Sequence, residues 1–323
     1  GMEGMFRQIG IYAPFGQKYK PVDADQLMYY REDQKGQVLQ EGISEPGAMS
    51  AWMAAASSYS VSGLPMLPFY IYYSMFGFQR VGDSAWQAGD MRARGFMLGG
   101  TAGRTTLNGE GLQHEDGQSH VQSSLIPNVR SYDPTFAYEV VTIVQYGMQR
   151  MLGEQRDEYF YLTLMNENYA HPDMPEGSAD GIIKGMYLLR DSGLGTRDSG
   201  KGKGKSGKDA LCVQLMGRGT ILREVIAAAD LLDKEFGVKA DIWSCPSFTE
   251  LARDGVDAER WNRMHPEAKS PRTAWITQQL QGRQGPAIAA SDYVRSFANH
   301  GLECATMRYS VLGTDGYGRS DTR

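Results

Sequence analysis

The sequence has little that points to a membrane, an oxidising compartment or a nucleic-acid partner. Its three cysteines, Cys212, Cys245 and Cys304, are odd in number and far apart, which fits reduced thiols better than a disulfide framework. The longest apolar candidate for a membrane span, residues 63–78, is interrupted by two prolines. No signal-peptide pattern is present. The net charge of −5 offers no basic field for nucleic acid or an anionic membrane surface. We therefore expect a cytoplasmic globular protein.

The composition is that of a protein with a substantial core. Of the 323 residues, 41% are hydrophobic and 22% are charged, and the length suits two domains of ordinary size. The chain begins at Gly1 without an initiator methionine and stops at "GRSDTR" without an obvious closing element. We interpret it as a piece of a longer polypeptide.

One segment, residues 192–209, consists largely of glycine, lysine and serine, so it is predicted to be a flexible surface loop. It contains Gly204-Lys205-Ser206, which superficially suggests a phosphate-binding loop. That motif requires a glycine five positions before Gly204, where this sequence has Ser199, and no helix-forming run follows directly. We therefore do not assign nucleotide binding to it.

Strand-like and helix-like segments alternate on both sides of this loop. The pattern predicts helices over 44–59, 133–152 (with Asp133 as the cap and Pro134 in the first turn) and 220–236, and strands over 67–76, 159–166, 210–217, 238–245, 285–293 and 308–313. The strand–helix–strand unit after the loop has short connections, which favours a parallel sheet. We predict an α/β fold of two consecutive sandwich domains with mainly parallel sheets, covering residues 1–175 and 176–323.

Residues 107–120, "LNGEGLQHEDGQSH", are dense in groups that ionise near neutral pH. They include Glu110, His114, Glu115, Asp116 and His120. Two histidines six positions apart do not share a helical face, and no tight zinc signature is present. The spacing alone leaves open a polar structural loop, an acid–base site exposed by the neighbouring glycines, and a metal site.

Glu45 is a second candidate, at the predicted start of a helix. A glutamate there commonly caps the helix or interacts with its dipole. In a functional role, the carboxyl would be buried against an apolar wall, which raises its pKa and lets it share a proton. The aromatic run at 69–78 could supply that wall, although such a run is more commonly core packing.

Longer motifs identify a family that the sequence resembles. They are "QEGISEPGAMSAWMAAASSYS", "PFYIYYSMFGFQRVGD", "GRTTLNGEGLQHEDGQSH", "IPNVRSYDP", "NENYAHPDMPEG", "SFTELARDG" and "GTDGYGRSD". In this order they resemble the homodimeric, bacterial type of the decarboxylating pyruvate dehydrogenase component, a thiamine diphosphate enzyme. The resemblance implies a transketolase-like fold, with residues 1–175 as the pyrimidine-binding domain, truncated at its start. Residues 176–323 would be most of the C-terminal domain, with an insertion at 192–209.

The resemblance also implies roles for individual residues. Glu45 would hydrogen-bond the pyrimidine ring of the cofactor, and Tyr73 and Phe76 would pack around the cofactor. Glu110 and His114 would face the substrate and act in catalysis, a task that suits histidine because its charge changes nearest neutral pH. The role of His120 stays open. Another histidine often stands in the family where this chain has Gln118, which puts in doubt a proton relay through the loop.

The implied reaction is decarboxylation of pyruvate and transfer of the acetyl group to the lipoyl arm of a partner acyltransferase, between glycolysis and acetyl coenzyme A. The cofactors would be thiamine diphosphate and Mg²⁺, whose Gly-Asp-Gly…Asn ligands would lie in a missing N-terminal domain; we assign no metal ligand within the chain. A homodimer is implied, and the chain alone is predicted to be inactive. Three alternatives are the same chemistry on a larger 2-oxo acid or a transketolase substrate, a metal-dependent hydrolase built on His114, Asp116 and His120, and a non-catalytic binding module.

Overall fold

The computed structural model describes residues 5, 8–22, 30–105, 107, 110–165, 167–194 and 211–318, and every structural statement below concerns those residues. Most of the loop predicted over 192–209 lies outside them. The chain separates into two compact units, residues 1–48 and 49–323, and each is described by itself. Within the described residues, no helix is both long and apolar enough to cross a membrane.

The first unit contains a small parallel strand pair. Strand β1 (Ile11–Tyr12) pairs with β2 (Glu32–Asp33), and the Tyr12 amide donates to the Val38 carbonyl at 2.8 Å. Ile11 is 4% exposed and is the buried apolar side chain of this pair. Helix α2 (Glu45–Ala56) begins in this unit and ends in the next.

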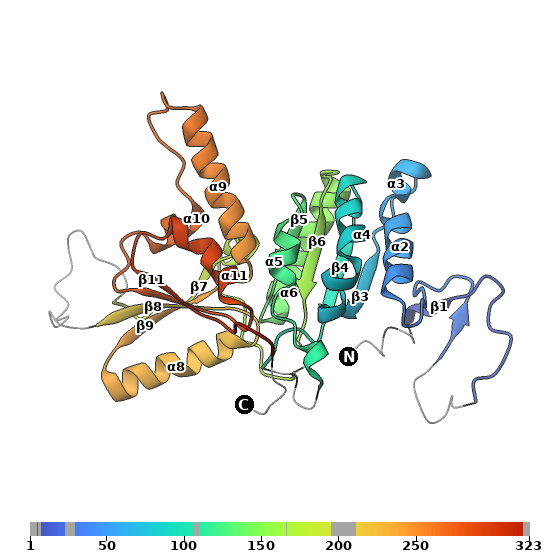
Figure 1. The fold of residues 1–323 in the computed structure, drawn as a ribbon, viewed down its shortest axis with the longest axis horizontal. Helices are drawn as coiled ribbons and strands as arrows, with labels where there is room; N and C mark the ends of the chain where they lie inside the picture. The colour runs from blue at the N-terminus through green and yellow to red at the C-terminus, as the bar shows by residue number, and fades with distance from the viewer. Residues whose placement is uncertain are drawn as a thin grey trace. The chain divides into compact units, whose positions relative to one another are not determined.

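The second unit holds a four-stranded parallel sheet in the order β3-β4-β6-β5 (Figure 1). Its strands are β3 (Phe69–Tyr73), β4 (Phe96–Gly100), β5 (Val129–Tyr132) and β6 (Tyr159–Thr163). The other elements of this part are α3 (Ser58–Val61), η1 (Ser74–Phe76), α4 (Phe78–Asp90), η2 (Leu112–His114), α5 (Ser119–Ser124), α6 (Ala137–Met148) and the π-helical turn η3 (Gln149–Gly153).

Both faces of the central strand β6 are buried. The Tyr161 ring packs edge-on against Phe78 of α4 at 4.9 Å, and the Phe160 ring packs against Tyr146 of α6 at 6.1 Å. Because successive residues of a strand point to opposite faces, α4 and α6 cover opposite sides of the sheet. This is the sandwich predicted from the sequence, and the continuous apolar run at 159–166 is explained by its central position.

A five-stranded sheet follows, in the order β11-β10-β8-β9-β7. Its strands are β7 (Tyr187–Arg190), β8 (Cys212–Gly217), β9 (Lys239–Ser244), β10 (Ala287–Ala290) and β11 (Tyr309–Leu312); β7 is antiparallel to β9 and the other pairs are parallel. The helices around it are α7 (Ala179–Lys184), α8 (Ile221–Phe236), α9 (Phe248–Met264), α10 (Trp275–Leu280), α11 (Arg295–Ala298) and η4 (Asn299–Cys304).

This sheet is also covered on both faces. Leu215 and Ile242 pack in one apolar cluster with residues of α8, whereas Met216 and Trp243 pack in another with residues of α9, α10 and α11. The α/β architecture with mainly parallel sheets is therefore confirmed, including the predicted parallel β8–α8–β9 unit. The domain boundary at 175/176 stays a prediction.

Two predicted elements differ from the structure. Helix α6 begins at Ala137 rather than Asp133, because the Glu139 carboxylate accepts the Phe136 amide at 3.0 Å and caps the helix there. The strand predicted as buried over 67–76 is β3, whose alternate residues Phe69, Ile71 and Tyr73 are 45%, 40% and 50% exposed. The reason is topological, since β3 is an edge strand of its sheet.

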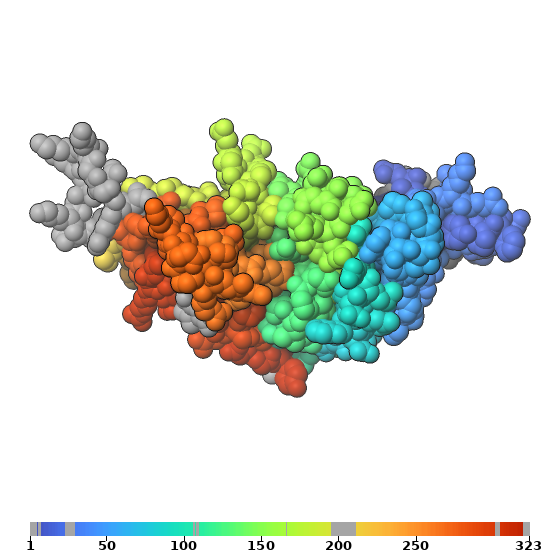
Figure 2. Space-filling model, turned by 90° about the horizontal axis from the view of Figure 1, so that it is seen from above, coloured from blue at the N-terminus to red at the C-terminus, as the bar shows by residue number. Residues whose placement is uncertain are grey.

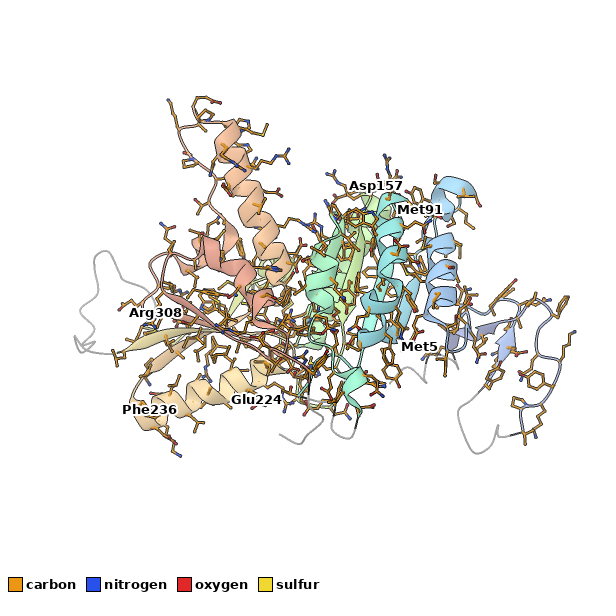
Figure 3. All side chains as sticks on the ribbon, viewed as in Figure 1. Met5, Met91, Asp157, Glu224, Phe236 and Arg308 are labelled. Atoms are coloured by element: carbon orange, nitrogen blue, oxygen red, sulfur yellow. The ribbon has the colours of Figure 1, made fainter. Side chains whose placement is uncertain are left out.

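The carboxyl ends of the parallel strands in the two sheets converge. Asp133, directly after β5, accepts the Thr163 hydroxyl of β6 at 2.5 Å and pairs at 3.2 Å with Arg218, directly after β8. In Figure 3, Glu224 near the start of α8 lies on the side of the first sheet, and Phe236 at the end of α8 lies far from it. Ligands of open parallel sheets bind beyond such carboxyl ends, so the site is expected here.

A second contact joins the first sheet to helix α9. It is made of ion pairs and lies nearer the amino ends of the strands of the first sheet. Arg130 of β5 bonds to Glu158 at 3.1 Å and to Glu250 of α9, and Arg253 donates to Glu250 at 2.7 Å. In Figure 2, the orange surface of α9 adjoins the green surface of the first sheet. The Arg130 pKa is raised because the carboxylates of Glu250 and Glu158 favour its charged form over the opposing effect of burial.

Candidate functional site

The loop of residues 110–118, here called the 110–118 loop, connects the first sheet to α5. Asp116 fixes its end, since the carboxylate accepts the amides of Gln118 and Ser119 at 3.1 and 3.0 Å and the Ser119 hydroxyl at 2.5 Å. The Ser119 hydroxyl also accepts the Tyr161 hydroxyl of β6 at 2.8 Å. Asp116 therefore has a structural role, at the start of α5.

His114 lies against two of the aromatic residues singled out in the sequence. Its ring centroid is 4.9 Å from that of Tyr73 and 4.9 Å from that of Phe76, with both contacts edge-to-face. Its Nδ1 atom is 3.7 Å from Oε2 of Glu110 and has no hydrogen-bond partner among the described residues. The structure thus brings Tyr73, Phe76, Glu110 and His114 together.

This cluster suits the binding of a flat ring and the movement of a proton. The Tyr73 side chain is half exposed, so part of an aromatic wall is open to a ligand. The side chain of His114 is 16% exposed beside a Glu110 side chain that is 40% exposed. An imidazole next to a carboxylate and an apolar wall can give or take a proton at a bound substrate.

Glu45 is the first residue of α2, and its side chain is half-buried. It belongs to the unit of residues 1–48 and is described only within its helix. Its predicted hydrogen bond to a pyrimidine ring stays a prediction.

His120 lies in a different environment from His114. It is fully buried, with its Nδ1 at 2.6 Å from the Ser131 hydroxyl and its Nε2 at 2.8 Å from the Thr163 hydroxyl. Burial lowers the pKa of His120 well below its ordinary value, and the Arg218 guanidinium lowers it further. A neutral imidazole with both nitrogens occupied by hydroxyl groups is a structural element of the core.

The metal-dependent hydrolase alternative required His114, Asp116 and His120 to converge on one ion. These side chains instead have separate surroundings: the aromatic wall, the start of α5 and the buried hydroxyl pair. Among the described residues, no group of three or more histidine, cysteine, aspartate or glutamate side chains is arranged to hold a metal ion. The structure therefore does not support this alternative.

Sequence reasoning missed the polar residues that join the two sheets near this site. Asp133 was predicted as a helix cap, but its carboxyl is buried, which raises its pKa, and the nearby Arg218 guanidinium opposes that effect. Arg104 and Asp292 were not singled out, although they lie close to the ends of β4 and β10. The rule that ligands and polar groups gather at the carboxyl ends of parallel strands would have been the signal.

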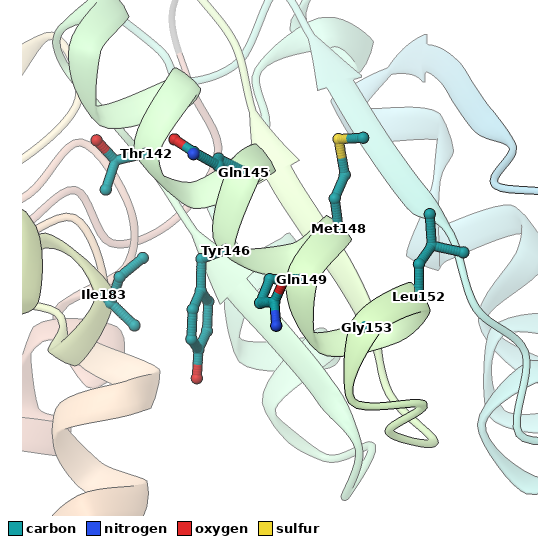
Figure 4. A pocket seen from close by; sticks show the side chains of 8 residues that line it. All are labelled: Thr142, Gln145, Tyr146, Met148, Gln149, Leu152, Gly153 and Ile183. Carbon is teal, nitrogen blue, oxygen red and sulfur yellow. The ribbon is translucent and has the colours of Figure 1, made fainter.

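A shallow pocket of about 530 Å³ lies elsewhere, on the outer face of α6 and η3 (Figure 4). Tyr146, Met148, Leu152 and Ile183 line it together with small polar side chains. No carboxyl, histidine, cysteine or basic side chain is among its lining residues, so it offers no acid–base pair.

The residues around His114 fit one end of the thiamine diphosphate that the sequence resemblance implies. The half-exposed Tyr73 ring suits contact with a heterocycle, and the adjacent imidazole suits a substrate carbonyl. Among the described residues, no group of three or more histidine, cysteine or acidic side chains is arranged to hold the Mg²⁺ ion. The fit is therefore to the ring end of the cofactor alone.

Comparisons with known proteins show which family the chain is similar to. The family described as "Pyruvate dehydrogenase E1 component middle domain" matches residues 1–172, and the family "Transketolase-like TK C-terminal domain" matches residues 203–323. Proteins named "Pyruvate dehydrogenase E1 component" from Cupriavidus necator, Pseudomonas aeruginosa and Escherichia coli are 60%, 58% and 56% identical over the whole chain. The chain spans 35% of the length of each of these relatives.

Solved structures show the same fold at lower identity. A transketolase from Campylobacter jejuni superimposes with a TM-score of 0.57 at 17% identity, covering 90% of this chain and 36% of that one. A split gene transketolase, an inactive beta4 tetramer, does so with a TM-score of 0.58 at 13% identity, covering 98% of this chain and 88% of that one. These likenesses support the transketolase-like fold.

Proposed function

The chain belongs to the family of the pyruvate dehydrogenase E1 component middle domain, and from this we propose that it is part of an enzyme that decarboxylates pyruvate and passes the acetyl group to a lipoylated acyltransferase. The supporting sequence observation is the 60% identity to the Cupriavidus necator protein over all 323 residues. The supporting structural observation is the cluster of His114 and Glu110 against an open aromatic wall.

Thiamine diphosphate, when bound, would supply the carbanion that adds to the keto carbon of the substrate. Tyr73 and Phe76 would hold its ring end through the exposed Tyr73 face and the edge of the Phe76 ring. His114 would orient the pyruvate oxygen through a hydrogen bond and move a proton during acetyl transfer. Glu110, 3.7 Å from the His114 Nδ1 atom, would help to orient that imidazole toward the substrate.

Glu45 would hydrogen-bond the pyrimidine ring of the cofactor. A carboxyl hydrogen-bonded to the pyrimidine nitrogen shares a proton with it, which is the task that the family resemblance implies for Glu45. We propose that the Mg²⁺ ligands and the diphosphate contacts lie in the part of the relatives that this chain does not span, and that the complete site forms in a homodimer. The location we propose is the cytoplasm, which suits the free cysteines.

The proposed function is tested with a chimera, in which these 323 residues replace the matching 35% of the Cupriavidus necator protein. With thiamine diphosphate, Mg²⁺ and pyruvate, the chimera is expected to release CO₂ and to acetylate a lipoyl domain. The chain alone is expected to release none. The matched variants are His114→Gln and, as a control, Gln113→Ala, because the Gln113 side chain is exposed in the same 3-10 turn.

His114→Gln keeps a hydrogen-bonding side chain but cannot move a proton, so a loss of about 10²-fold or more in acetyl transfer is expected. Gln113→Ala is expected to retain the activity. A chimera that folds, binds thiamine diphosphate and does not act on pyruvate would contradict the proposal.

A further inference from the structure

A single arginine connects the 110–118 loop to the C-terminal part of the chain. The Arg104 guanidinium donates from Nη1 to the Thr314 carbonyl at 2.7 Å and from Nε to the Glu115 carbonyl at 3.4 Å. Arg104 is 7% exposed, and its bond to Glu115 is buried whereas its bond to Thr314 is partly buried. The guanidinium fork therefore bridges the residue next to His114 and a segment about 200 positions later in the sequence.

The guanidinium also packs directly on the backbone of the loop. A Cβ atom on Gly117 would collide with Cζ, Nη2 and Nε of Arg104. The side chain thus lies flat against Gly117, and only glycine leaves room for it. The Gly117 carbonyl accepts the Val294 amide at 2.9 Å, which adds a second bond from the C-terminal part to the same residue.

The backbone of Arg104 is also bonded to the C-terminal part of the chain, through Asp292. Oδ2 of Asp292 accepts the Arg104 amide at 2.5 Å and the Thr105 amide at 3.0 Å. Gly103, with φ of +85°, lets the chain turn toward this carboxylate, with which a Cβ atom at that position would collide. Asp292 therefore fixes the base of the side chain that reaches Glu115 and Thr314.

His114 itself is held by fewer hydrogen bonds than Arg104. Its amide bonds to the Gly111 carbonyl at 3.0 Å within the short turn η2, and its ring rests on Tyr73 and Phe76 without a hydrogen bond at Nδ1. The position of its imidazole thus depends on where the following residues are held. A displacement of about 1 Å is enough to weaken a catalytic group strongly.

From these contacts we infer that Arg104 is a positioning residue: it sets the place of His114 from the C-terminal part of the chain, through Glu115, Gly117 and Thr314. The catalytic consequence rests on the proposed function, whereas the structural coupling does not. The C-terminal part thereby acts on the site through the contacts of Arg104.

The coupling is tested by amide hydrogen exchange in the 323-residue chain, at His114 and at Val294, with Arg104→Met and Arg104→Lys. Lysine keeps the charge and most of the stem, which protects the fold, but one ammonium group cannot reproduce the planar fork. Both variants are expected to speed exchange at both amides about tenfold or more, because the loop opens more often once the fork is lost.

Arg94→Met is the matched control. Arg94 also bonds a carbonyl and a carboxylate, Gln155 and Asp157, at 2.9 and 3.0 Å, but at the opposite end of the first sheet, where Figure 3 labels Asp157. Its loss is expected to leave exchange at His114 unchanged. Unchanged exchange at His114 in both Arg104 variants, or an equal rise in Arg94→Met, would overturn the inference.

The catalytic consequence is measured in the chimera described above. Arg104→Lys is expected to lower kcat for acetyl transfer about tenfold and to change KM for pyruvate by less than about twofold, since it disturbs the alignment of a catalytic group rather than substrate binding. A wild-type kcat in that variant would overturn the catalytic part. If the chimera with Arg104 intact has no pyruvate activity, the proposed function fails and the exchange result alone decides the coupling.

Discussion

Glu115 is expected to make the folded chain less stable as the pH rises through neutrality. Its side chain is 1% exposed, and neither carboxyl oxygen has a hydrogen-bond partner among the described residues. Its pKa is raised from 4.5 to about 7, because burial and the Asp292 and Glu110 carboxylates together outweigh the opposing Arg104 guanidinium. The perturbation that isolates this effect is Glu115→Gln, which keeps the shape and removes the ionisable group.

The direction and size of the change in unfolding free energy follow from the pKa values of Glu115 in the folded and unfolded states. The folded state binds the Glu115 proton more tightly than the unfolded state, whose carboxyl titrates near 4.5. Stability is therefore greatest below pH 4.5 and falls until the pH exceeds the folded pKa of about 7. Each pH unit in this window costs about 1.4 kcal/mol, so the folded state loses up to about 3 kcal/mol in all.

The assay is urea unfolding of the chain and of Glu115→Gln between pH 5 and pH 8. The quantity of interest is the difference in the free energy of unfolding between the two proteins, because the titration of all shared groups cancels in it. This difference should shift by about 2–3 kcal/mol in favour of Glu115→Gln as the pH rises. A difference that stays constant over this range would refute the reasoning.

Two further predictions concern the buried polar side chains Glu250 and His120. Glu250→Gln leaves Arg130 and Arg253 without their shared carboxylate, so urea unfolding at low salt should show a loss of about 2–4 kcal/mol, whereas Glu259→Gln, whose side chain is 67% exposed, should cost less than about 1 kcal/mol. His120 is buried with a pKa well below its ordinary value, so its stabilising contribution is present at neutral pH and is lost as the pH falls below about 6.5. His120→Gln should remove that acid sensitivity, and an unchanged pH dependence in this variant would contradict the assignment of a neutral imidazole.

Helices and strands that form through interactions between nearby residues were predicted from the sequence. The apolar periodicity of 220–236 and the two short apolar runs around it correspond to α8, β8 and β9 within two residues at each end. The prediction that Asp133 caps a helix was wrong. A helix cap is predicted from neighbouring residues, whereas Asp133 pairs with the Arg218 guanidinium, 85 positions later in the sequence. No periodicity reports such a contact.

The site residues that belong to the family motifs were predicted from the sequence. Glu110, His114, Tyr73 and Phe76 came from the family resemblance, and the structure brings them together. Arg104 and Asp292 were not predictable in this way, because their roles depend on how the two sheets pack. The raised pKa of Glu115 was not predictable either, because it follows mainly from burial, which the sequence of a polar loop conceals.

The central claim is that this chain carries the substrate-facing part of a thiamine diphosphate site for pyruvate. It is tested most directly by measuring CO₂ release from carboxyl-labelled pyruvate, together with acetylation of a lipoyl domain, for the chimera, its His114→Gln variant and the 323-residue chain alone. The account predicts thiamine-dependent release by the chimera, a loss of about 10²-fold or more in the subsequent acetyl transfer for His114→Gln, and none by the chain alone. Release by the chain alone, or a folded, cofactor-bound chimera without release, would contradict it.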